Sequence, residues 1–300
     1  MQSPQWDDLI PDPQARSILG GVIGLMDVVF PGRIRGCYLL GSQSDGTTVA
    51  LSDIDLMVLF RESLGTDEGE VFARVVEACE LLSPVRLDIT AQSEQTFHAA
   101  DVRLKLGSVP VAGDDIRAQL PLPTPQEHAR YITNWTNFFI RRLHDIPHLR
   151  APLVYPDSSD SFYGYATVRI PEWYSPGVTT GTKELAAIVC WTATALLSLK
   201  LGEAGYVGTK GEAVRRYRDL GDGAWGDYVS VVYTRCRGAW HYEVPQGAEE
   251  QDELRALCAS ALPFFNHYLA TYHEYLMEQR QAADPVHREW AEDQLSAWAE

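Results

Sequence analysis

The amino-acid sequence predicts an α+β protein, in which a small mixed β-sheet flanked by helices is followed by an all-helical bundle. Up to residue 115, amphipathic helical segments alternate with short apolar runs that are typical of strands. The run 120–125, Leu-Pro-Leu-Pro-Thr-Pro, cannot continue a helix or a strand. Beyond it, apolar residues recur almost throughout at helical spacing. We therefore expect two domains, residues 1–122 and residues 123–300.

In the first half, several predicted elements have local start or stop signals. The helix over 13–29 ends at Pro31-Gly32, and the helix over 66–82 begins at Thr-Asp-Glu and stops before a Ser-Pro pair. The predicted elements, in order, are helix 13–29, strand 36–40, strand 56–60, helix 66–82, strand 85–90, helix 95–107 and strand 108–112. This alternation predicts an α/β unit with its site at the ends of the strands.

The second half has the longer helices. We expect helices over 125–144, 185–201, 209–220, 225–242 and 251–282, and a last one after Asp284-Pro285. Residues 145–181 are rich in Pro, Ser and Tyr, and we interpret them as irregular. The segment 185–201 is the most apolar one, but it carries polar residues and is short for a bilayer. We expect it to be a buried helix and expect no membrane partner.

Composition limits the class of protein. The chain has 300 residues, of which 45% are hydrophobic and 22% are charged, as in soluble globular proteins. Its formal net charge of −16 disfavours long nucleic acid as a partner and is compatible with a cationic small molecule. The N-terminal residues have neither a basic start nor an apolar run, and the five cysteines have no metal-ligand spacing. We therefore expect a cytoplasmic protein with reduced thiols.

The stretch 41–55, Gly-Ser-Gln-Ser-Asp-Gly-Thr-Thr-Val-Ala-Leu-Ser-Asp-Ile-Asp, lies between two predicted strands. In an extended chain Asp53 and Asp55 point to the same face, and the residue between them points into the core. Two adjacent carboxylates repel each other unless a cation lies between them, and Mg²⁺ is the expected hard, oxygen-seeking ion. Gly41 lets the backbone approach a ligand closely, and the Ser42 hydroxyl can bond a phosphate oxygen. The stretch therefore predicts a site for phosphate and metal.

Gly-Ser, a short spacer and Ser-Asp-Ile-Asp-Leu resemble the signature of the DNA polymerase β-like nucleotidyltransferases. That family draws a third carboxylate from a later strand, and Asp88 in Val-Arg-Leu-Asp-Ile-Thr supplies one. The resemblance implies that Asp53, Asp55 and Asp88 are catalytic and bind Mg²⁺, with Asp88 as metal ligand, general base or both. It also implies that three residues bind the phosphates of ATP, the co-substrate: Gly41, Ser42 and Ser52. Without the family resemblance, Asp53 would be interpreted as a helix or turn cap and Asp88 as a surface residue.

A second resemblance, to the aminoglycoside adenylyltransferases that act on streptomycin and spectinomycin, covers most of the chain more weakly. It is carried by the turn 205–213, Gly-Tyr-Val-Gly-Thr-Lys-Gly-Glu-Ala, and by the predicted domain joint at 111–123. It implies a catalytic first domain and a helical domain that covers nucleotide and substrate. In that domain Lys210 would reach the triphosphate, and Trp173 or Trp135 would contact the acceptor. Two features of those enzymes are missing: an arginine on the helix before the turn, and acidic residues after Trp173.

The sequence therefore predicts a Mg²⁺-dependent transferase that moves AMP from ATP to a hydroxyl of a small, cationic molecule such as an aminoglycoside, with release of pyrophosphate. Such an activity would confer antibiotic resistance. Two alternatives stay open. One is a protein-modifying, AMPylating enzyme like the antitoxin members of the superfamily, and the other is a non-catalytic nucleotide or metabolite binder. We expect a monomer or a homodimer.

Overall fold

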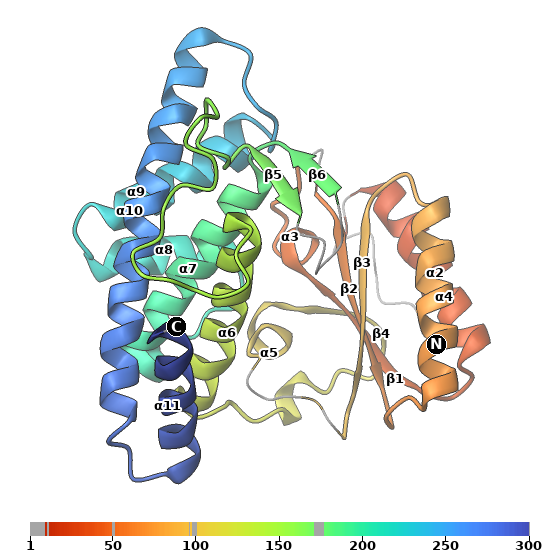
Figure 1. Ribbon diagram of the computed structural model, residues 1–300. Coiled ribbons are helices and arrows are strands. Elements are labelled where there is room, and N and C mark those ends of the chain that lie inside the picture. The colour runs from red at the N-terminus through yellow and green to blue at the C-terminus, as the bar shows by residue number, and fades with distance from the viewer. Residues whose placement is uncertain are drawn as a thin grey trace. The chain divides into compact units, whose positions relative to one another are not determined.

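The computed structural model describes residues 10, 12–49, 52–95, 97, 101–170 and 177–299. Its contacts divide the chain into two compact units (Figure 1). The first comprises Met1–Pro123 and Val207–Thr209, and the second comprises Thr124–Tyr206 and Lys210–Glu300. A small mixed sheet with helices in the first unit and a mostly helical second unit confirm the predicted α+β class. That the two units are domains with separate roles stays a prediction.

The sheet of the first unit has four strands in the order β3-β2-β1-β4. The strands are β1 (Ile34–Leu40), β2 (Ile54–Phe60), β3 (Leu87–Ser93) and β4 (Val109–Gly113). β1 runs antiparallel to β2 and β4, whereas β2 and β3 are parallel. The parallel pair is joined by a helix, because a crossover connection must return the chain to the starting edge of the sheet. The end of β1 and the starts of β2 and β3 consequently meet at one edge.

Two helices, α2 (Pro13–Val29) and α4 (Thr66–Leu82), cover one face of this sheet and have the predicted bounds (Figure 1). The Asp12 side chain caps α2 by accepting the amide hydrogen of Gln14 at 2.9 Å. The larger of two cores joins the apolar stripes of these helices to the strands. Its fully buried members include Leu19, Met26, Cys37, Leu39, Ile54 and Phe60.

The opposite face of the sheet carries a smaller core. It consists of Tyr38, Leu40, Met57, Leu59, Leu104 and Ile116. Leu104 belongs to α5 (Arg103–Gly107). A helix over 95–107 was predicted, but among the described residues of that range only 103–107 are helical. The Asp101 carboxylate accepts hydrogen bonds from the Arg103 amide at 3.0 Å and from its guanidinium at 2.9 Å, which favours a helix start at this point.

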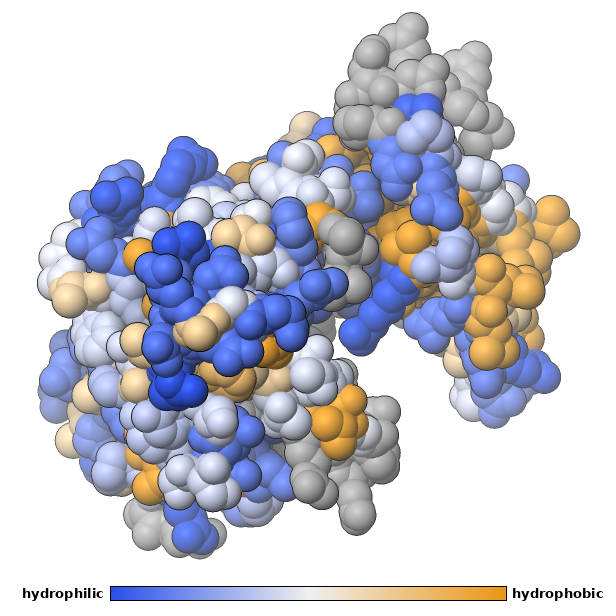
Figure 2. All heavy atoms as spheres, turned by 90° about the horizontal axis from the view of Figure 1, so that it is seen from above, coloured by the Kyte–Doolittle hydropathy of each residue, from blue (hydrophilic) through white to orange (hydrophobic). Residues whose placement is uncertain are grey.

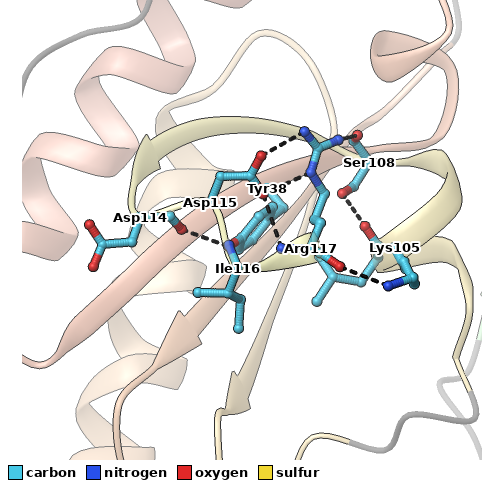
Figure 3. A network of polar contacts seen from close by, with 8 residues as sticks. Tyr38, Lys105, Ser108, Asp114, Asp115, Ile116 and Arg117 are labelled. Atoms are coloured by element: carbon cyan, nitrogen blue, oxygen red, sulfur yellow. Dashed lines mark hydrogen bonds and ion pairs between the residues drawn. The ribbon is translucent and has the colours of Figure 1, made fainter. Parts of the chain in front are cut away.

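Tyr38 holds the chain that follows β4 against β1 (Figure 3). Its side chain is fully buried, and its hydroxyl donates to the Asp114 carbonyl at 2.7 Å and accepts from the Ile116 amide at 3.1 Å. Burial raises the pKa of this hydroxyl, so it stays protonated at neutral pH. Beside it, the Arg117 guanidinium bonds both carboxylate oxygens of Asp115, at 2.9 and 2.8 Å. Side-chain hydrogen bonds therefore fix the segment that follows the end of β4.

Replacing Tyr38 with phenylalanine should lower the free energy of unfolding by about 1–3 kcal/mol, because the buried Ile116 amide and the partly buried Asp114 carbonyl lose their shared partner. Urea unfolding of the variant and the wild-type chain measures the change. The slope of the free energy against urea should stay the same, since the surface exposed on unfolding hardly differs. An unchanged free energy would contradict a stabilising role for the two hydrogen bonds.

Apolar side chains gather on the outer helices of the first unit, at the right of Figure 2. The large apolar residues exposed there are Leu25 and Val28 of α2 and Leu81 and Leu82 of α4. Leu81 and Leu82 are 81% and 86% exposed. On the face of α4 that packs against the larger core, Phe72 is buried, and the other apolar residues are only partly buried: Val71, Val75, Val76 and Cys79. The inner stripe of α4 is therefore incompletely covered.

The second unit consists of helices and one two-stranded sheet. Its elements are α6 (Pro125–His144), β5 (Thr167–Ile170), β6 (Gly177–Thr180), α7 (Lys183–Leu201), η2 (Gly202–Gly205), α8 (Lys210–Leu220), α9 (Trp225–Val232), the π-helix η3 (Tyr233–Ala239), α10 (Ala248–Gln279) and α11 (Pro285–Ala299). The long helices lie within a few residues of their predicted ranges. The antiparallel pair β5–β6 was not predicted, because residues 145–181 carry no clear alternation of apolar and polar residues.

The segment Lys183–Gly205, which includes α7, is long and apolar enough to cross a membrane by length and composition alone. In the structure, 61% of its apolar window is buried, as in the central helix of a packed bundle. α7 packs against α6, α8 and α10, which agrees with the predicted buried helix. No other helix in the described part of the chain meets the same criteria.

His144, the last residue of α6, is a buried titratable group of the second unit. Its Nδ1 lies 3.0 Å from the Val154 carbonyl oxygen, and its Nε2 lies 3.5 Å from the Tyr165 hydroxyl. Burial lowers the pKa of His144 from 6.5 to about 4, although the hydrogen bond to Val154 opposes the change. At neutral pH the ring is therefore uncharged in the folded chain.

We expect His144 to lower the free energy of unfolding as the pH falls. The unfolded chain takes up the proton near pH 6.5 and the folded chain only near pH 4, so the unfolded state gains protons first and the stabilisation is lost as pH falls between these values. Between pH 7 and pH 5, the free energy of unfolding should decrease by about 2 kcal/mol because of this residue. Urea unfolding at both pH values should show a smaller loss for His144→Asn, and an unaltered loss for the exposed control His148→Asn. Equal losses in all three proteins would contradict this expectation.

Candidate active site

The three carboxylates singled out from the sequence lie at the edge of the sheet where β1 ends and β2 and β3 begin. Asp55, the second residue of β2, pairs in register with Asp88, the second residue of β3. Such partners in adjacent parallel strands lie about 5 Å apart and carry their side chains on the same face. Asp53 precedes β2, and Ile54 between the two aspartates is fully buried, as the alternation predicted.

The face that carries these carboxylates is the one with the smaller core. Asp55 alternates with core residues along β2 so that it shares its face with Met57, a member of that core. On β3, Leu87 and Ile89 belong to the larger core, and Asp88 between them is exposed. Asp53 and Asp55 are half-buried. The apolar strands thus hold the backbone of the aspartates in place while the carboxylates stay accessible.

Gly41 sets the space in which the Asp55 carboxylate lies. It begins the one-turn helix α3 (Gly41–Ser44) directly after β1, with a φ of +63°. An ideal Cβ at this position would overlap Oδ2 of Asp55 and lie 3.0 Å from its Cγ. The positive φ favours glycine for a second, independent reason. Any side chain at position 41 would therefore have to displace the carboxylate.

Ser42 in α3 and Ser52, which directly precedes Asp53, are both buried. The carbonyl of Ser42 accepts from the Thr47 amide at 3.1 Å. The hydroxyl oxygen of Ser52 accepts from the Val49 amide at 2.9 Å, and the Ser52 amide donates to the Val49 carbonyl, also at 2.9 Å. Ser52 therefore closes the loop that leads to Asp53. Its hydroxyl hydrogen is not used by the bond from Val49 and can be donated.

The chemistry of Asp53, Asp55 and Asp88 fits Mg²⁺, because hard cations prefer carboxylate oxygens. The register of β2 and β3 and the missing Cβ at Gly41 leave room for two carboxylates on one face. Among the described residues, no three His, Cys, Asp or Glu side chains are gathered into a group that could hold a metal ion. Like charges repel each other, so we expect these carboxylates to converge only around a cation.

The predicted ligand-binding residues of the second half have different outcomes. Lys210 is the exposed first residue of α8, and its charge opposes the rise in pKa that burial causes at the Cys190 thiol. Trp173 lies outside the described residues. Trp135, the alternative, is 42% exposed on α6 and stacks on Phe139, with ring centroids 5.9 Å apart. The roles of Lys210 and of both tryptophans stay predictions.

One polar residue of this region was not singled out from the sequence. Ser44, the last residue of α3, has its hydroxyl oxygen 2.8 Å from the Gly41 carbonyl and 2.8 Å from the Gly107 carbonyl. Its only signal in the sequence is a second hydroxyl two positions after Ser42. Gly107 is 63 residues away, so no local pattern connects the two.

No family model matches the chain, and a search of curated proteins finds no match. Among solved structures, it is similar to a spectinomycin adenyltransferase, AAD(9), from Enterococcus faecialis with ATP and spectinomycin. The identity is 11% and the TM-score 0.48, over 83% of this chain and 99% of that one. It is also similar to a toxin-antitoxin structure with AMP-PNP, at 16% identity and a TM-score of 0.26, over 41% of this chain and 90% of that one. Both TM-scores lie below 0.5, so the proposals below depend on this chain's own residues.

Proposed function

We propose that the chain is a Mg²⁺-dependent nucleotidyltransferase that moves AMP from ATP to a hydroxyl of a small, cationic acceptor such as an aminoglycoside, with release of pyrophosphate. One observation carries the proposal. Asp55 and Asp88 are paired in register at the edge where Asp53 enters the sheet, and the carboxylate of Asp55 lies over a glycine backbone. A hard cation such as Mg²⁺ binds carboxylate oxygens of this kind directly.

Asp53, Asp55 and Asp88 would hold the Mg²⁺, which when bound neutralises charge on the attacked phosphate and on the departing pyrophosphate. Asp88 is exposed, which suits a base that takes the proton of the acceptor hydroxyl. The acceptor oxygen then forms a bond to the α-phosphorus, and the bond from that phosphorus to the bridging oxygen breaks. The half-buried Asp53 and Asp55 have restricted positions, which suits residues that orient the reacting groups.

Four residues would bind the nucleotide. Gly41 has no side chain to keep a phosphate away from the backbone, and Ser42 follows it in the same turn. Ser52 has a hydroxyl hydrogen to donate to a phosphate oxygen. Lys210 is an exposed cation at the start of α8, and a triphosphate would offset its unfavourable place near the positive end of the helix dipole.

The acceptor follows from charge. A net charge of −16 attracts a cationic molecule and repels polyanions, which favours an amine-bearing acceptor over long nucleic acid. Trp173 is the residue that we propose to contact it. ATP and Mg²⁺ are both available in the cytoplasm, the compartment that we propose for the chain. With an aminoglycoside as acceptor, the reaction would produce antibiotic resistance.

The test uses ATP with radioactive phosphorus at the α-position, incubated with the purified chain and Mg²⁺, with and without streptomycin or spectinomycin. Labelled drug together with pyrophosphate is the expected result, and it should vanish when Mg²⁺ is chelated. Labelled protein with unlabelled drug would favour the AMPylating alternative. Bound but intact ATP, with neither label transferred nor pyrophosphate formed, would contradict the proposed transfer to these drugs and favour a binder.

A further inference from the structure

The hydroxyl of Ser44 connects two segments of the first unit. Its oxygen lies 2.8 Å from the carbonyl oxygen of Gly41, in its own turn, and 2.8 Å from that of Gly107, at the end of α5. A serine hydroxyl has a single hydrogen, which these two acceptors share. Gly41 in turn is the residue whose backbone lies under the carboxylate of Asp55. Ser44 is therefore connected to the proposed catalytic residue Asp55 through a single residue, Gly41.

The second end of this connection is a close approach of two glycines. A Cβ on Gly107 would overlap the carbonyl of Gly208, with its carbon at 2.5 Å and the Gly208 Cα at 2.8 Å. A Cβ on Gly208 would lie 2.5 Å from the carbonyl carbon of Leu106 and 2.6 Å from the Gly107 amide nitrogen. These atoms belong to the backbone and cannot move aside as a side chain would. Residues Val207–Thr209 group with the first unit, although they are far from it in the sequence.

We propose that Ser44 is a positioning residue for Asp55, and that it acts by tying the Gly41 turn to the Gly107–Gly208 contact. The reason is that α3 is too short to hold its own conformation. It has four residues, no side-chain cap and a glycine at positive φ, so its internal hydrogen bonds are few. Such a turn keeps its geometry only through contacts with the rest of the unit, and Ser44 supplies one. The inference rests on the proposed function in so far as Asp55 is catalytic.

Ser44→Ala should therefore affect the site more than the fold. We expect kcat for AMP transfer to fall roughly tenfold and the Mg²⁺ concentration for half-maximal activity to rise several-fold, because a small displacement of a metal-binding carboxylate weakens both. Ser44→Thr keeps the hydroxyl and should restore both values toward the wild type. Ser17→Ala, at an exposed position of α2, is the matched control and should change neither. A purely structural role would lower the melting temperature and leave the Mg²⁺ dependence unaltered.

Hydrogen exchange of the backbone amides tests the connection without any assay of activity. Ser44→Ala should increase exchange in two separate segments, 41–47 and 207–209, and leave β4 protected. Gly208→Ala, whose methyl would overlap the backbone of α5, should increase exchange over 41–47 as well, whereas Gly24→Ala, with open space at its Cβ, should not. Increased exchange in 41–47 alone after Ser44→Ala would overturn the proposal. If the wild-type chain transfers no AMP, the proposed function fails, and the exchange result still decides on the connection.

Discussion

Asp53→Asn is expected to abolish AMP transfer, with a loss of roughly 10³-fold or more, while the free energy of unfolding stays close to that of the wild type. The substitution keeps the size of the side chain and removes its charge. Without that charge the cation loses a ligand, and the negative charge that develops on the triphosphate is no longer balanced. Because Asp53 is half-buried before β2 and not part of a core, the fold should tolerate the amide.

The measurement is the rate of pyrophosphate release with ATP and an aminoglycoside at saturating Mg²⁺, together with urea unfolding of the same preparation. Asp27→Asn, at an exposed position of α2 in the same unit, is the control for a lost surface carboxylate. It should keep full activity. Full activity of Asp53→Asn at ordinary Mg²⁺ concentrations would rule out the metal site that we propose.

Gly41→Ala is expected to lower activity roughly 10²-fold, because its methyl group can be accommodated only if the Asp55 carboxylate moves. The positive φ adds a cost of about 1–2 kcal/mol in the free energy of unfolding, since an alanine disfavours that conformation. The two effects are separable. Activity reports the displaced carboxylate, whereas urea unfolding reports the strained backbone.

Gly46→Ala is the matched control, because it lies in the loop that follows α3. Gly46 has a φ of +70°, nearly the same as Gly41, but a Cβ built on it meets nothing within 4 Å. This control should therefore show the loss of stability and keep the activity. Equal activity losses in the two variants would mean that backbone strain, and not the position of the Asp55 carboxylate, limits the reaction.

The elements that could be predicted most accurately have strong local signals at both ends. α2 and α4 have the predicted bounds residue for residue, because caps, Pro-Gly and Ser-Pro pairs and a 3.6-residue apolar period are all encoded within a few positions. Of the helix predicted over 95–107, the described residues are helical only in α5, which starts where the Asp101 side chain accepts the Arg103 amide. The pair β5–β6 was missed because its short strands are paired through tertiary context, with Gly181 bonded to Ala166 and Thr182 to Tyr242.

The candidate site, too, has features that follow from the local sequence and features that depend on the tertiary structure. Alternation along a strand is a local property, so the sequence by itself determined that Asp53 and Asp55 leave the core on one side and that Asp88 does so from another strand. Only the tertiary structure decided that Asp88 is in register with Asp55, that Gly41 lies under a carboxylate, and that Ser44 reaches Gly107 and, through it, the residues around Gly208. These contacts depend on strand order and on packing between segments far apart in the chain, and neither leaves a periodic trace in the sequence.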